Sequence, residues 1–174
     1  AEGAGAVTMR RVAADAGVTT MATYRHYPNR GALLRSVTDA AFAELGKSWG
    51  RRGDPNDFDS RVEGLLDDFL DFVLDKPNLY VFLITERREG MRQFPRDFQD
   101  GGSPAFIPIM DAVKQGMRDG ALRPDDPLEV TLAITATAMG LSNLYIGGRI
   151  ELPETEFRAL AKRSHERILN GFRA

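Results

Sequence analysis

Apolar residues recur every three or four positions along most of the chain, which is the spacing of helices that bury one face. In the first fifty residues this pattern predicts two short helices and a longer one, over 9–16, 19–27 and 30–49. Ala16, Gly17 and Val18 separate the first two, a turn short enough to hold them close together. Thr8 and Asn29 each precede a predicted helix and are residue types that cap helices.

Longer helical patterns follow, separated by polar and proline-containing breaks. Residues 50–57 have the composition of a polar linker. Ser103 and Pro104 resemble the N-cap and first residue of a helix. Strand-like alternation is absent, so the sequence predicts an all-α protein with units over 1–50 and 51–174. The helices predicted for the larger unit cover about 58–75, 79–84, 103–119, 127–147 and 154–172.

The helix predicted over 127–147 is apolar nearly all round. No residue from Val130 to Gly148 is charged, and a membrane span needs about 20 mostly apolar residues. Threonine, serine, asparagine and glycine interrupt this segment, so we interpret it as a buried helix of a protein without a membrane segment. Its apolar surface exceeds what one neighbour covers, which favours a homodimer that pairs through 127–147 and 154–172. The alternative is a monomer in which both faces are internal.

Charge is distributed unevenly along the chain. The net charge is −2, but residues 1–53 carry eight basic and four acidic side chains, and the remainder is correspondingly acidic. A basic head on an acidic body suits contact of the head with phosphates. The chain contains no cysteine, which excludes a disulfide scaffold and fits a reducing cytoplasm, the location that we expect.

Residues Val7 to Leu34 closely resemble the DNA-binding signature of the TetR family of bacterial transcriptional regulators. The matching features are the Ala-x-x-Ala-Gly-Val turn, the Tyr-x-His-aromatic sequence and the Pro-x-basic step after it. The resemblance implies an N-terminal helix-turn-helix head whose second helix enters the major groove of double-stranded operator DNA. It also implies a C-terminal helical body that binds a small-molecule effector and dimerises, so that the effector releases a repressor from its operator.

The same resemblance assigns roles to individual residues. Thr19 and Thr20 would meet a phosphate at the start of the second helix. Met21 would contact a thymine methyl group, and Arg30, where the family usually has lysine, would contact a phosphate. The predicted DNA-contacting residues are Thr8, Thr19, Thr20, Met21, Tyr24, Arg25, His26 and Arg30.

The sequence also departs from the family pattern. Thr23 stands where the family usually has leucine, and Gly31 where it has glutamate, so we expect looser local packing and a weaker helix start. We expect Val18, Thr23 and Tyr27 to pack inward. The family has a helix before Val7, of which residues 1–6 resemble only the end, so we expect that first helix to be largely absent from this sequence.

Large apolar side chains on the central helices of the larger unit are candidates for lining a ligand cavity, although at helical spacing such residues more often form core. Asn143 and Arg87 are the polar residues that we expect to orient a ligand, and a surface ion pair is the alternative for Arg87. An aromatic and thioether-rich lining favours a hydrophobic effector. The predicted ligand contacts are Phe69, Phe72, Phe82, Arg87, Phe106, Met110, Met139 and Asn143.

Residues suited to catalysis are few. The two histidines, His26 and His165, lack the spacing of a metal site, and neither a phosphate-binding glycine loop nor a Gly-x-Ser-x-Gly elbow occurs. We therefore expect no metal, no cofactor and no enzymatic activity. The alternative hypothesis is a helical small-molecule-binding or enzymatic domain without DNA binding.

Overall fold

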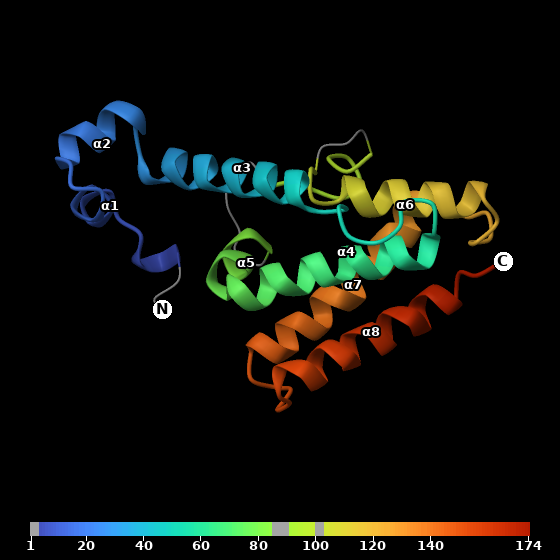
Figure 1. The fold of residues 1–174 in the computed structure, drawn as a ribbon. Coiled ribbons are helices and arrows are strands. Elements are labelled where there is room, and N and C mark those ends of the chain that lie inside the picture. Colours follow the sequence, from blue (N-terminus) through green and yellow to red (C-terminus); the bar gives the residue numbers. More distant parts are fainter. Residues whose placement is uncertain (1–3, 85–90, 100–102) are drawn as a thin grey trace.

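The computed structural model describes residues 4–84, 91–99 and 103–174 (Figure 1). These residues form eight α-helices, one short 3-10 helix and no strand, which confirms the predicted all-α fold. In chain order the elements are η1 (Ala4–Ala6), α1 (Met9–Asp15), α2 (Thr20–His26), α3 (Arg30–Ser48), α4 (Phe58–Asp75), α5 (Pro77–Ile84), α6 (Ile107–Arg118), α7 (Pro127–Ile146) and α8 (Glu154–Asn170).

The N-terminal helices form a small head at one end of the molecule, and α3 runs from it to the body (Figure 1). Helices α1 and α2 pack on each other, and Gly17 in the turn between them has φ +67°, a left-handed conformation that favours glycine. The Thr8 hydroxyl accepts a hydrogen bond from the Arg11 N–H at 3.2 Å, which confirms the predicted cap of α1. Asn29 caps α3 in the same way, through the Ala32 N–H at 2.8 Å.

Helix α4 lies at the centre of the body and packs against α5, α6, α7 and α8. Val62, Val113 and Ile134 belong to a buried cluster that joins α4, α6 and α7. On α8, Phe157 is fully buried, and its ring stacks on Tyr145 with 3.9 Å between centroids. Burying a side chain of this size contributes about 1.5–3 kcal/mol, so these contacts fix how α7 and α8 pack on α4.

Helix α3 joins the body through its C-terminal end. Leu45 is buried there, and the Trp49 ring packs edge-on against Phe69 with 6.2 Å between centroids. A Cβ atom on Gly46 would lie 2.9 Å from Cβ of Pro104, closer than such atoms normally come. Gly46 therefore allows α3 to contact the segment that precedes α6.

Three details differ from the sequence-based expectations. Helix α6 begins at Ile107 instead of Pro104, because Pro108 fits only the first turn of a helix and would disrupt one that began four residues earlier. Val18 lies in the turn with its side chain 47% exposed, so it does not pack inward as predicted. The helical spacing of Phe157, Leu160, Ala161, Ser164 and Ile168 predicts one buried face of α8, whereas the buried residues of that helix are Phe157, Ala161, His165 and Leu169.

Within a single chain, helix α7 is buried along one side only. Val130, Thr131, Ile134 and Ser142 are buried, but Leu132 and Leu144 on the same helix are exposed. After Glu129, α7 carries no charged side chain on its buried or its exposed residues, which is why the sequence pattern shows no polar side.

Within the described ranges, no helix has the length and apolar character needed to cross a membrane.

Candidate functional site

The head presents one face of α2 to solvent. Met21 is 68% exposed and Tyr24 48%, although both are large and partly apolar. Arg25 and His26 are exposed on the same helix, and Thr20 is half-buried. Exposed apolar and basic groups on a short helix can contact base edges and phosphates in a DNA groove.

On the inner face of α2, Thr23 occupies the position where the family usually has leucine. Thr23 is buried, and its hydroxyl donates a hydrogen bond to the main-chain carbonyl of Thr20 at 2.7 Å. The hydroxyl is therefore satisfied within the helix and carries no desolvation penalty. Thr19, which is exposed, caps the same helix by accepting a hydrogen bond from the Ala22 N–H at 3.2 Å.

Arg30 has a structural contact that the sequence did not predict. Its Nε donates a hydrogen bond to the main-chain carbonyl of Val7 at 2.7 Å. This bond joins the first residue of α3 to the segment just before α1, where Thr8 is exposed. The two residues are 23 positions apart, and no local pattern indicates a contact over that separation.

The body encloses a cavity of about 470 Å³. Helices α3 to α8 all contribute to its wall, together with residues 91–98 and 103–106. Aromatic rings from several of these elements line it, namely Phe42, Trp49, Phe69, Phe98 and Phe106. A cavity of this size and lining suits a small apolar ligand.

The structure brings together only some of the predicted ligand contacts. Phe69, Phe106 and Met139 line the large cavity. Met110 lines a separate pocket of about 110 Å³ beside α6. Asn143 is exposed near the end of α7 and is not part of the cavity wall.

Two further predicted contacts, Phe72 and Phe82, lie outside the cavity wall. Both are buried in a cluster around Tyr80, whose ring meets that of Phe72 edge-on with 6.3 Å between centroids. Phe72 and Phe82 are therefore core residues, which is the more common role of large apolar residues at helical spacing. Arg87 lies outside the described residues.

The cavity also contains residues that the sequence analysis did not select. Thr38 and Phe42 reach it from α3, and His165 from α8. His165 lies four residues after buried Ala161 and eight after buried Phe157, a helical spacing that could have revealed it. The placement of Thr38 depends on how α3 crosses the body, which no local pattern specifies.

The cavity wall differs in polarity from place to place. Arg35, Asp39 and Arg92 contribute charged groups, and exposed Asp39 and Met91 mark its opening. The Arg92 guanidinium lies over the Phe42 ring, 4.8 Å from its centroid. The charged groups of the wall therefore come from α3 and residues 91–98, while the side chains from α4 to α8 are mostly apolar.

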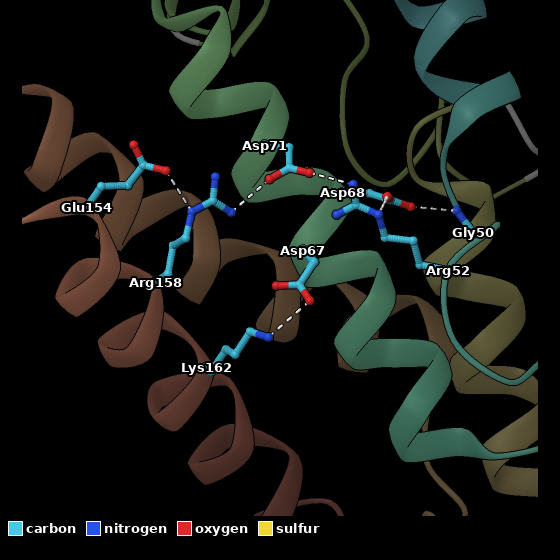
Figure 2. A network of polar contacts seen from close by, with 8 residues as sticks. All are labelled: Gly50, Arg52, Asp67, Asp68, Asp71, Glu154, Arg158 and Lys162. Atoms are coloured by element: carbon cyan, nitrogen blue, oxygen red, sulfur yellow. Dashed lines mark hydrogen bonds and ion pairs between the residues drawn. The ribbon is translucent and has the colours of Figure 1, made fainter.

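An ion-pair network connects the linker after α3 to α4 and α8 (Figure 2). Asp68 of α4 accepts a hydrogen bond from the Gly50 N–H at 3.0 Å and pairs with Arg52 at 3.1 Å. Arg52 also pairs with Asp71 at 2.6 Å, and Asp71 pairs with Arg158 of α8 at 2.8 Å. These bonds hold the end of α3 in a defined position relative to α8.

The pKa values of two carboxyl groups in this network, those of Asp68 and Asp71, are shifted in opposite directions. Burial raises the pKa of Asp68, and the Gly50 N–H and Arg52 only partly oppose it. Burial also acts to raise the pKa of Asp71, but hydrogen bonds and charges of Arg52 and Arg158 together outweigh it and hold that pKa below its ordinary value. Asp71 is therefore the carboxylate that the network stabilises most clearly.

A helix-turn-helix head joined by a long helix to a helical body with a cavity is the architecture of one-component transcriptional regulators, which carry both domains in one polypeptide. Residues 62–168 match the family profile "Tetracyclin repressor-like, C-terminal domain", and residues 1–37 match "Bacterial regulatory proteins, tetR family". The chain belongs to the TetR family, and it is a regulator with an N-terminal DNA-binding domain and a C-terminal ligand-binding domain.

Solved structures share this fold at low sequence identity. The fatty acid degradation regulator FadR from Bacillus halodurans is 14% identical with a TM-score of 0.77, over 98% of this chain and 91% of its own. A TetR-family transcription regulator from Shewanella sp. PV-4 is 17% identical with a TM-score of 0.70, over 100% and 91%. The flavonoid-responsive regulator FrrA is 20% identical with a TM-score of 0.65, over 99% and 89%. None of the curated proteins compared with the chain matches it.

Proposed function

We propose that this chain is a repressor that binds operator DNA as a homodimer and is released by a small hydrophobic effector. The observation that carries the proposal is the cavity of about 470 Å³, because part of its wall is α3, the helix that also carries the head. A ligand in that cavity contacts the one helix that connects the two functions. We place the division between the two units near residue 50, where α3 has ended and the linker begins.

Surface exposure supports DNA contacts by the head. Seven of the eight predicted contacts are exposed, and Thr20 is half-buried. The positive charge of residues 1–53 would draw this surface toward phosphates. Met21, which is the most exposed large apolar residue of α2, suits contact with a thymine methyl group.

Helices α7 and α8 support a dimer interface. Leu132, Ala136, Gly140 and Leu144 are exposed at four-residue spacing on α7 and form an apolar stripe. A Cβ atom on Gly140 would meet nothing within 4 Å, so this part of the stripe is open to a close neighbour. Two copies that pair α7 and α8 would bury the stripe in a four-helix interface, as a two-fold dimer requires.

The cavity lining supports an apolar effector. Among the similar proteins, FadR is named as a regulator of fatty acid degradation and FrrA as responsive to flavonoids, so their names do not indicate one shared effector. The aromatic rings and the two methionines in the wall favour a hydrophobic molecule.

Release from DNA would follow from a population shift. A dimer must hold two recognition helices about 34 Å apart to reach successive major grooves. An effector that binds better to a conformation with another spacing reduces the population that can bind the operator.

Binding to the duplex upstream of the gene for this chain tests the proposal. We expect fluorescence anisotropy to show binding that weakens steeply with salt, because phosphate contacts release counterions. A reporter fused to that duplex should be repressed by the chain. In a panel of neutral aromatic and aliphatic compounds, at least one should release the chain from the DNA and restore reporter expression. Binding that ignores salt, or none at all, would instead favour a helical ligand-binding or enzymatic domain without DNA binding.

A further inference from the structure

One of the buried polar side chains in the wall of the cavity is an imidazole. His165 of α8 is only 7% exposed, yet it lines the same cavity as the aromatic rings. Neither of its ring nitrogens has a hydrogen-bond partner among the described residues. A buried polar group without a partner opposes folding, so His165 is poorly explained as a packing residue.

Two hydroxyl groups of the wall are already satisfied. The Thr38 hydroxyl donates to the Leu34 carbonyl at 2.9 Å, and the Thr135 hydroxyl donates to the Thr131 carbonyl at 2.9 Å. Both bonds stay within one helix and require no ligand. His165 therefore differs from these two residues, because no group in the described part of the chain uses its hydrogen-bonding capacity.

The imidazole is neutral under ordinary conditions. Burial lowers the pKa of His165 to about 4, and the charge of Glu63 only weakly opposes the shift. A neutral imidazole offers one N–H donor and one acceptor nitrogen, which a hydroxyl group can match in either direction. A neutral imidazole gives an anionic ligand no positive charge to pair with, and the cations of the wall, Arg35 and Arg92, come from α3 and residues 91–98 instead of α8.

The remaining walls favour a flat ring system. Trp49 and Phe69 meet edge-on with 6.2 Å between centroids, and Phe98 and Phe106 do so with 5.0 Å. Rings arranged in this way offer both edges and faces to an aromatic ligand, and such contacts add to simple burial.

We propose that the effector is an uncharged aromatic compound with a hydroxyl group, and that His165 selects it by a hydrogen bond to that hydroxyl. This inference rests on the proposed function, because it specifies the ligand of the same cavity. Both ring nitrogens are covered in the present side-chain position. The hydroxyl reaches one of them when the ring turns about its Cβ–Cγ bond, a torsion with broad preferences in histidine.

A matched pair of probes tests the selection without DNA. Biphenyl and 4-phenylphenol differ only in one hydroxyl group, and biphenyl-4-carboxylate adds a charged alternative. Trp49 is the only tryptophan of the chain and lines the cavity, so its emission reports occupancy. We expect 4-phenylphenol to bind the full chain about tenfold more tightly than biphenyl, the effect of one hydrogen bond of about 1.4 kcal/mol.

Two variants assign the selection to His165. His165→Phe removes the hydrogen-bonding atoms but keeps a planar ring, and we expect the preference for 4-phenylphenol to fall below about twofold. His165→Gln keeps a donor and an acceptor, and we expect most of the preference to remain. Thermal unfolding of each variant checks that it folds, and the comparison of probes on the unaltered chain needs no variant.

Equal binding of biphenyl and 4-phenylphenol to the unaltered chain, or the absence of binding by both, would overturn the inference. So would tighter binding of biphenyl-4-carboxylate that persists in His165→Phe, because the ligand head group would then lie at the charged opening. Each of these outcomes leaves operator binding and repression untouched. Failure of the proposed function would instead appear as a chain that does not bind DNA, whatever its response to the probes.

Discussion

Arg30 Nε and the main-chain carbonyl of Val7, 2.7 Å apart, connect the first residue of α3 with the segment that precedes α1. The same guanidinium is the predicted phosphate contact at the start of α3. A guanidinium has five N–H groups, so one can hold Val7 while others point elsewhere. Arg30 therefore combines a structural contact with a proposed DNA contact.

Two variants distinguish the structural role of Arg30 from its proposed role in DNA binding. Arg30→Lys keeps the positive charge but loses the Nε bond, and we expect a stability loss below about 1 kcal/mol and several-fold weaker DNA binding. Because the charge remains, the salt dependence of binding should be unchanged. Arg30→Ala should weaken binding to all sequences alike and reduce the salt slope by about one.

Arg25→Lys is the matched control, since Arg25 is exposed on α2. It should leave thermal stability unchanged. An Arg30→Ala variant that altered only sequence preference would contradict the assigned phosphate contact.

Thr19 also combines two roles. Its hydroxyl caps α2, so Thr19→Ala should lower the free energy of unfolding by about 1 kcal/mol, whereas Thr19→Asn keeps a capping side chain and should cost much less. Chemical denaturation measures both. If DNA affinity falls in Thr19→Ala but not in Thr19→Asn, the cap accounts for the effect, and equal losses would point to direct contact by the hydroxyl.

Local patterns were sufficient to predict the helices and the caps. Thr8 precedes α1 and Asn29 precedes α3 as predicted, because capping depends on residues within one turn. The start of α6 was predicted too early, because Ser103-Pro104 satisfies the local rule while Pro108 excludes it. The helical fold class could therefore be predicted from the sequence, but the start of α6 was set by Pro108, four residues beyond Pro104.

The cavity was less predictable than the helices. Phe69 and Phe72 are three residues apart on α4, yet Phe69 lines the cavity while Phe72 packs in the core cluster around Tyr80. Composition and periodicity place both on the buried side and cannot distinguish core from cavity wall. That distinction depends on the crossing of six helices, and so does the contribution of Thr38 from α3.

Asp71 is the shared partner in the network that links Arg52 to Arg158. Asp71→Asn should lower stability by about 1 kcal/mol near neutral pH, since these pairs are partly exposed. The lowered pKa of Asp71 means that its contribution is present above the ordinary carboxyl value and is lost as pH falls through the lower folded value. Urea denaturation of both proteins at neutral pH and near pH 3 measures the difference, which should be smaller at acid pH.

Glu154→Gln provides a control for this network. It removes one exposed pair between residues four apart on α8 and should cost no more than about 0.5 kcal/mol. Equal losses in both variants would mean that the shared position of Asp71 adds nothing.

The buried imidazole predicts a particular acid sensitivity. The folded state lowers the pKa of His165 from 6.5 to about 4, so between these values the unfolded chain binds more protons. Stability should therefore be retained above about pH 6.5 and should fall between pH 6.5 and 4, by up to about 3 kcal/mol from this group. Comparing the unaltered chain with His165→Phe across this range isolates the effect, because carboxylates titrate in both.

In His165→Phe the decline over this pH range should be shallower, and stability at pH 7 should equal or exceed that of the unaltered chain. Parallel curves would show that the imidazole is not held neutral by burial.

The apolar stripe on α7 predicts a substitution that separates two copies. Leu144→Arg places a charge on the stripe, and we expect the chain to become monomeric at micromolar concentration in analytical ultracentrifugation. Val37→Arg is a matched control, because Val37 on α3 is 41% exposed and Leu144 is 40% exposed. A dimer that survives Leu144→Arg unchanged would place the interface elsewhere.

The close contact of Gly46 with Pro104 makes α3 a lever with unequal arms. At a rise of 1.5 Å per residue, Phe42 lies about 6 Å from this pivot and Arg30 about 24 Å from it. A sideways displacement of about 0.5 Å at Phe42, where a ligand would push, becomes about 2 Å at Arg30 by the ratio of these arms. Amplification of this kind would let a small change within the cavity misalign the head with a groove of DNA.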